Sequence, residues 1–117
     1  MPPLTALASG CYHDPTMDQD RLAHALERVE RMLRGYVERS PYRLNPDLVT
    51  VRHVRDGLAE HLVLHGRMYC PCREVTGAPE RDRPNICPCT THAEEIARTG
   101  ACECGIFVSA DYAKEAR

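Results

Sequence analysis

Six cysteines of this chain occur as three Cys-x-Cys motifs. The motifs are Cys70-Pro71-Cys72, Cys87-Pro88-Cys89 and Cys102-Glu103-Cys104, with fourteen residues between the first two and twelve between the second two. In the first two motifs the proline fixes its own φ and favours extended backbone at the cysteine before it, so neither motif fits inside a helix. The sequence therefore predicts pairs of thiols held on stiff bends.

The number of clustered cysteines indicates metal and redox chemistry. A [4Fe-4S] cluster takes four thiolates, and its iron atoms suit an all-cysteine shell. Six cysteines exceed that number by two, and two thiols beside a centre that transfers single electrons suit two-electron disulfide chemistry. Spacing alone does not decide which four of the six are ligands.

Two other interpretations use the same cysteines differently. A structural zinc site would make the chain an interaction module without catalytic activity, but it leaves two cysteines idle, and zinc sites usually have Cys-x-x-Cys spacing. A scaffold of three disulfides needs an oxidising compartment. The N-terminal residues have no positively charged segment before an apolar run, so no secretion signal is predicted and a reducing cytosol is the expected location.

Length and composition predict one small domain. The 117 residues suffice for one core, and we expect a tail at 1–15 followed by a single domain at 16–117. Fifteen basic and seventeen acidic residues give a net charge of −2, which argues against a nucleic-acid-binding protein with a broad positive surface. No stretch is long and apolar enough to cross a membrane.

Two long helices are predicted before the first motif. Thr16 and Gln19 form a capping-box pattern, and apolar residues then recur at helical spacing as far as Val37, before Ser40-Pro41 ends the helix. A second apolar face is formed by Leu48, Val51, Val54, Leu58, Leu62 and His65, and Gly66 is the expected stop.

The cysteine-rich half is predicted to be an ordered loop with short elements. Residues 66–90 contain four prolines and four cysteines and show little periodicity. Thr91 and Glu94 predict a capped helix that reaches about Arg98 and stops at Gly100, with an extended segment at 106–108 and a last helical turn from Ser109. The expected fold class is mainly α: a small multihelical domain packed around a cysteine-rich loop layer that holds a [4Fe-4S] cluster.

The three motifs with their neighbours resemble a known family. Tyr69-Cys70-Pro71-Cys72-Arg73, Asn85-Ile86-Cys87-Pro88-Cys89 and Cys102-Glu103-Cys104-Gly105-Ile106-Phe107 are similar to the catalytic (beta) subunit of ferredoxin:thioredoxin reductase, whose pattern is Cys-Pro-Cys, Cys-Pro-Cys, Cys-His-Cys. The resemblance covers about residues 17–112, including both predicted long helices.

This resemblance implies a role for each clustered cysteine. It implies that the cluster ligands are Cys70, Cys87, Cys89 and Cys102. It further implies that Cys72 and Cys104 form the redox-active disulfide, with Cys72 the exposed thiol that attacks the substrate and Cys104 lying against the cluster. The implied enzyme is a thioredoxin (protein-disulfide) reductase that takes single electrons from a ferredoxin.

The third motif departs from the family pattern, because Glu103 stands where the family has histidine. The family histidine is thought to assist proton transfer at the active disulfide. Glu103 is therefore a candidate catalytic residue, and His92 or His65 could approach the disulfide in its place. His61 and His65 are four residues apart on a predicted helix, which we interpret as packing or surface rather than as a metal site.

The resemblance also implies partners. The donor would be a ferredoxin-like or rubredoxin-like protein, the acceptor a thioredoxin-like or glutaredoxin-like protein, and a small β-barrel variable subunit could be needed. Because ferredoxins are generally acidic, we expect a local basic docking face, for which the candidates are Arg67, Arg73, Arg81 and Arg83. Cys11, in the expected tail, is interpreted as an incidental thiol.

Overall fold

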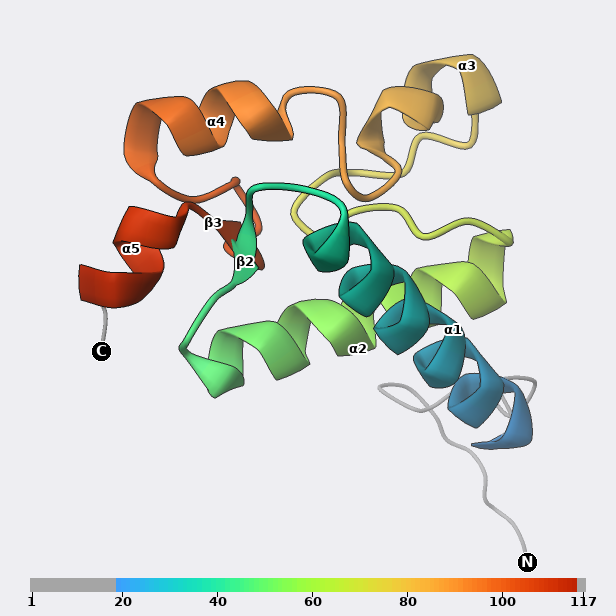
Figure 1. Cartoon of the computed structure of the whole chain (residues 1–117). Helices are drawn as coiled ribbons and strands as arrows, with labels where there is room; N and C mark the ends of the chain where they lie inside the picture. Colours follow the sequence, from blue (N-terminus) through green and yellow to red (C-terminus); the bar gives the residue numbers. More distant parts are fainter. Residues whose placement is uncertain (1–18, 116–117) are drawn as a thin grey trace, which may run out of the picture.

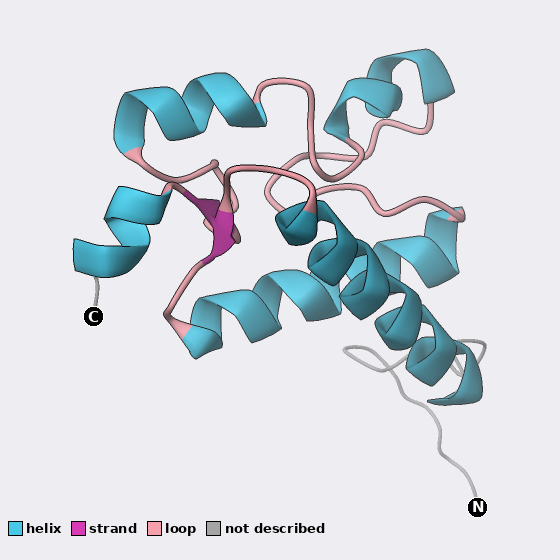
Figure 2. Ribbon diagram, in the orientation of Figure 1, coloured by secondary structure: helices cyan, strands magenta, loops and turns pink. Residues whose placement is uncertain are grey.

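The computed structural model describes residues 19–115, which are mainly helical, as predicted (Figures 1 and 2). Its elements are α1 (Gln19–Glu38), β2 (Arg43–Leu44), α2 (Leu48–His65), α3 (Pro79–Asp82), the 3₁₀ turn η1 (Arg83–Asn85), α4 (His92–Thr99), β3 (Phe107–Val108) and α5 (Ala110–Glu115). The expected tail at 1–15, Cys11 and the Thr16 cap lie outside the described residues. None of the helices at 19–115 combines the length and apolar character needed to span a membrane.

Helices α1 and α2 pack against each other and form the base of the core (Figure 1). The buried side chains of this contact are Ala25, Val29 and Leu33 from α1 and Val54, Leu58, Ala59 and Leu62 from α2. The two predicted apolar faces are thereby confirmed except at the two ends of α2, where Leu48 and His65 are exposed. Leu48 is 64% exposed, because it lies in the first turn of α2, which extends past the end of α1.

The predicted helix stops are confirmed, but one predicted cap is wrong. Gly66 and Gly100 adopt positive φ values of 75° and 92°, and their N–H groups donate to the carbonyls of Leu62 and Ile96. Thr91 precedes α4 as expected, yet its side chain makes no capping hydrogen bond. The Thr91 hydroxyl instead donates to Glu95 Oε2 at 2.7 Å, so the predicted box with Glu94 does not form.

A two-stranded antiparallel ribbon fastens the C-terminal segment to the α1–α2 connection. Arg43 pairs with Val108 and Leu44 with Phe107. The extended segment at 106–108 was predicted, and Ile106, Phe107 and Val108 are all fully buried. Its partner β2 was not predicted, because two residues are too few to show an alternating pattern.

The cysteine-rich loop contains two short helical turns that were not predicted. Helix α3 and turn η1 each have a proline in their first positions, where its fixed φ suits a helix start and its missing N–H costs nothing. The buried Asp82 closes this loop by accepting hydrogen bonds from the N–H and hydroxyl of Thr76, both at 2.9 Å, and from the N–H of Gly77 at 3.0 Å. The pKa of Asp82 is lowered, chiefly by the Thr76 N–H.

Candidate functional site

All three Cys-x-Cys motifs line one cavity. The residues around it are Cys70, Cys72, Cys87, Pro88, Cys89, His92, Cys102, Glu103, Cys104, Ile106 and Phe107. The seven residues that were candidates for catalysis or cluster binding are therefore all brought together. Among the described residues, no set of three or more His, Cys, Asp or Glu side chains is arranged around the position of one metal ion.

The first two motifs lie side by side because their backbones pair. Tyr69 and Ile86 form an antiparallel bridge, the N–H of Cys70 donates to Asn85 at 2.8 Å, and the N–H of Cys87 donates to Met68 at 2.8 Å. The Cys87–Pro88 peptide bond is cis. This pairing aligns two proline-stiffened bends across the cavity.

The third motif forms a tight turn on the ribbon. The N–H of Gly105 donates to the carbonyl of Cys102 at 2.8 Å, and the N–H of Cys102 donates to Phe107 at 3.0 Å. Gly105 has a φ of 84°, which a residue with a Cβ adopts only at a cost. The buried Asn45 secures the turn, since its side-chain amide donates to the Gly105 carbonyl at 2.8 Å.

Helix α2 supports the first motif at Gly57, where the lack of a side chain lets Pro71 approach the helix closely. A Cβ placed on Gly57 would lie 2.6 Å from Cγ of Pro71 and 2.8 Å from its Cβ. Only glycine therefore allows the proline of the Cys70-Pro71-Cys72 bend to rest directly on α2.

Burial divides the six cysteines into four and two. Cys70, Cys87, Cys89 and Cys102 are 4–8% exposed, whereas Cys104 is half-buried and Cys72 is exposed. All six are free thiols. The division coincides with the roles that the family resemblance implies, four ligands and a more accessible pair, although burial alone does not assign those roles.

Four of the thiols lie close enough to perturb one another's pKa values. The Cys104 thiol acts on both Cys72 and Cys70, and Cys70 also interacts with Cys87. Cys104 therefore lies between the exposed thiol and the buried set. A cysteine in this position can interact both with the exposed thiol of the pair and with the buried thiols.

The surroundings of four of the thiols, those of Cys70, Cys72, Cys102 and Cys104, favour their protonated forms. Burial, above all, raises the pKa of Cys102, against opposing hydrogen bonds from the N–H groups of Phe107, Gly105 and Ile106. Although Cys72 as a residue is exposed, desolvation of its thiol and the contact with Cys104 raise its pKa to about 12. The Glu103 carboxylate adds to this rise and the Arg73 guanidinium opposes it, so both charges act on Cys72.

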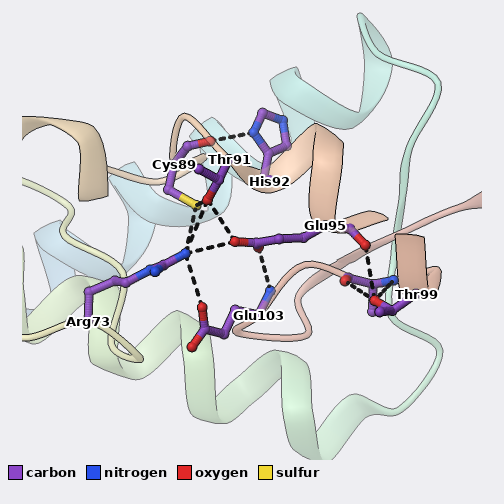
Figure 3. Close-up of polar contacts among 8 residues, drawn as sticks. Arg73, Cys89, Thr91, His92, Glu95, Thr99 and Glu103 are labelled. Atoms are coloured by element: carbon purple, nitrogen blue, oxygen red, sulfur yellow. Dashed lines mark hydrogen bonds and ion pairs between the residues drawn. The ribbon is translucent and has the colours of Figure 1, made fainter. Parts of the chain in front are cut away.

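Arg73, which follows the first motif, contacts one residue of the second motif and one of the third (Figure 3). Nη2 of Arg73, the residue after Cys72, lies 2.8 Å from Glu95 Oε2, 3.1 Å from Glu103 Oε1 and 3.7 Å from Cys89 Sγ. Glu95 of α4 also accepts the N–H of Glu103 at 2.8 Å through its other oxygen. Burial opposes ionisation of Glu95, but hydrogen bonds from Thr91, Glu103 and Arg73 outweigh it and lower the pKa of that carboxyl.

The three candidates for proton handling differ in position. Glu103 lines the cavity with its side chain about half exposed. His92 also lines it, but the Tyr36 hydroxyl contacts its Nε2 and its Nδ1–H donates to the Cys89 carbonyl, so both ring nitrogens are engaged. His65 packs against the rings of His61 and Tyr69 and is not among the residues that line the cavity.

The sequence prediction for the basic residues needs one correction. Arg67, Arg81 and Arg83 are exposed, as a docking face requires. Arg73 is engaged in two ion pairs inside the site, so it is not a free surface charge. Neither the Arg73–Glu95 pair nor its place beside Cys89 was predicted, because no periodic or spacing signal joins residues 22 positions apart.

The donor set fits an iron–sulfur cluster. Buried thiols in one cavity offer the soft ligands that such a cluster requires, and an N–H from Phe107 to Cys102 Sγ at 3.5 Å provides the hydrogen bonding typical of cluster thiolates. Arg73 provides the same kind of contact to Cys89.

A comparison with protein-family models places the chain among known proteins. The family model described as "Ferredoxin thioredoxin reductase catalytic beta chain" matches residues 19–117. The search of curated proteins gave no match. The matched range includes all three motifs and every described helix.

Proposed function

Because this chain belongs to the ferredoxin thioredoxin reductase catalytic beta chain family, we propose that it is an iron–sulfur disulfide reductase that uses Cys72 and Cys104 as its redox pair. Its family makes it an oxidoreductase. The finer proposal is that Cys70, Cys87, Cys89 and Cys102 bind a [4Fe-4S] cluster, and that the acceptor is a thioredoxin-like protein.

The observation that carries this proposal is the division of the thiols around one cavity. Four cysteines are buried and could bind a cluster out of contact with solvent, whereas Cys72 is an exposed residue whose thiol interacts with that of Cys104. A purely structural site would have no need of an accessible thiol in contact with a second one.

The cysteine pair performs the exchange in two steps. The Cys72 thiolate attacks one sulfur of the acceptor disulfide, which forms a mixed disulfide and releases the other acceptor sulfur as a thiol. Cys104 then attacks the Cys72 sulfur, which forms the Cys72–Cys104 disulfide and releases the second acceptor thiol. Two electrons thus pass from the pair to the acceptor, and two electrons and two protons must restore the pair.

The remaining groups support that restoration. A bound [4Fe-4S] cluster supplies the single-electron transfers by which a one-electron donor returns the disulfide to two thiols. Glu103 lies in the same cavity and acts electrostatically on Cys72, so we assign it the handling of the protons. Arg67, Arg81 and Arg83 are exposed cations that suit docking of an acidic ferredoxin-like donor.

The proposal is tested by anaerobic reduction of a thioredoxin with electrons from a reduced ferredoxin. Wild type should release two thiols per acceptor, and Cys72→Ser should bind as much iron but lose at least about a thousandfold in rate, because the nucleophile is absent. Cys87→Ser should lose iron as well as activity. Cys11→Ser, a change outside the three motifs, is the matched control and should behave like wild type.

Metal analysis of the same preparations separates this proposal from the interaction-module hypothesis. A brown protein with iron and acid-labile sulfide supports the enzyme. A colourless protein with one zinc per chain and no thiol release would contradict it.

A further inference from the structure

The cluster proposed above would be bound partly by Cys89, and that cysteine has an unusual neighbour. Its sulfur lies 3.7 Å from Nη2 of Arg73, a side chain that comes from the first motif. A guanidinium cannot lose its charge under ordinary conditions. A fixed positive charge thus stands beside a sulfur that must be an anion when it binds iron.

An ion pair with Glu95 and a hydrogen bond to Thr91 hold Arg73 in place. Glu95 Oε2 lies 2.8 Å from the same Nη2, and the Glu95 side chain is only 13% exposed. Thr91 adds an acceptor for Arg73 at 3.2 Å and donates to Glu95 at 2.7 Å. The guanidinium therefore cannot swing into solvent without breaking a largely buried ion pair.

A second nitrogen of the same guanidinium is also unusual. Among the described residues, Nε of Arg73 is buried and has no hydrogen-bond partner. Buried polar groups without partners are uncommon and each requires an explanation, of which a functional role is one. Figure 3 shows the guanidinium directed at Cys89, Glu95 and Glu103 together.

We propose that Arg73, anchored by Glu95, is a positioning residue that stabilises the anionic sulfur of Cys89 and thereby sets the reduction potential of the bound cluster. The inference rests on the proposed function. Reduction adds negative charge to a cluster, so a nearby cation and an N–H donor to a ligand sulfur favour the reduced form and raise the potential. Loss of Arg73 should therefore lower it.

The test is a redox titration of the cluster, followed by its visible absorbance under anaerobic conditions. We expect Arg73→Gln to shift the midpoint potential to a more negative value than that of wild type. Glu95→Gln frees the guanidinium from its anchor but also removes a negative charge, which by itself raises the potential, so its shift should be smaller than that of Arg73→Gln. Arg98→Gln, which removes an exposed arginine of α4, should leave the potential unchanged.

Arg73→Lys shows whether geometry matters as well as charge. Lysine keeps the cation but cannot present the planar fork, so its potential should lie between those of Arg73→Gln and wild type. If Arg73→Gln does not hold iron, the potential of Arg73→Lys carries the test. In Arg73→Gln we expect iron binding to weaken by about 10- to 100-fold, as for other groups that orient metal ligands.

The outcomes for the two proposals are distinct. A wild-type protein without a cluster would overturn the proposed function and this inference with it. A normal wild-type cluster whose potential is unchanged in Arg73→Gln, or in Arg73→Lys where Arg73→Gln holds no iron, would overturn the inference alone.

Discussion

Cys72 and Cys104 show how neighbours set the properties of identical side chains. Both are thiols in Cys-x-Cys motifs, yet Cys72 reaches solvent and Cys104 contacts the buried Cys70. The elevated pKa of Cys72, about 12, means that the thiol is a poor nucleophile in the structure as it stands. Attack on a substrate therefore depends on a group that removes the proton, for which we propose Glu103, since it lines the cavity and acts electrostatically on Cys72.

Asp82 gives a residue-scale prediction about stability. Its carboxylate accepts three hydrogen bonds within the loop at 76–82, and its pKa is lowered below the ordinary value of 3.8. A carboxyl with a depressed pKa stabilises the fold fully above the unfolded-state pKa and loses this contribution as the pH falls through the folded-state value. Asp82→Asn should therefore lower the free energy of unfolding at neutral pH and much less under acid conditions.

Urea unfolding at about pH 7 and about pH 3 measures this difference. Glu80→Gln, in the same loop but exposed, is the matched control and should have little effect at either pH. An equal loss of stability for Asp82→Asn at both pH values would show that its charge is not what holds the loop.

At the scale of elements, the contact between α2 and the first motif depends on Gly57. Replacing a helical glycine with alanine ordinarily stabilises a helix by about 0.5–1 kcal/mol. At Gly57 the new Cβ would lie 2.6 Å from the Pro71 ring, and such overpacking costs about 1–3 kcal/mol. We expect Gly57→Ala to lower the free energy of unfolding by about 1 kcal/mol and to weaken iron binding, because the bend carrying Cys70 must move.

Gly35→Ala provides the control on α1. Its Cβ would meet only the end of the Arg39 side chain, at 3.3 Å, and that end can move aside. Gly35→Ala should therefore raise stability while Gly57→Ala lowers it, as measured by denaturant unfolding. A gain in stability with full iron content for Gly57→Ala would show that Pro71 does not need α2 as its support.

At the scale of the whole molecule, cluster binding should be coupled to protons. Burial and interactions with neighbouring thiols raise the pKa of Cys102 and Cys70, so these proposed ligands are protonated at neutral pH in the protein without a cluster. Iron must displace those protons, which makes loading weaker as the pH falls. Anaerobic reconstitution with iron and sulfide should give more bound iron at about pH 8.5 than at about pH 6.5.

Removal of the cluster should also weaken the fold. The described core has one phenylalanine and includes four of the cysteines, so cluster binding would provide part of its stability. Chelation of iron should lower the thermal midpoint of wild type. Iron content that is independent of pH, or an unchanged midpoint after chelation, would contradict the proposed ligand set.

The sequence alone determined the features that depend on neighbours in the chain. The apolar spacing of α1 and α2, the stops at Gly66 and Gly100 and the extended segment before Ser109 were all predicted correctly, because helix periodicity and glycine preferences act locally. The prolines of the first two motifs likewise excluded a helix there. The three motifs in order were sufficient to indicate the family that the comparison identified.

Tertiary structure decided which groups meet. The different burial of Cys72 and Cys70, two residues apart, comes from how the bend rests on α2 and on the second motif, which no spacing encodes. The pairing of β2 with β3 joins residues more than sixty positions apart. The Arg73–Glu95 ion pair depends on where α4 lies relative to the first motif, since an ion pair between distant residues forms only when packing brings the charges within a few ångströms.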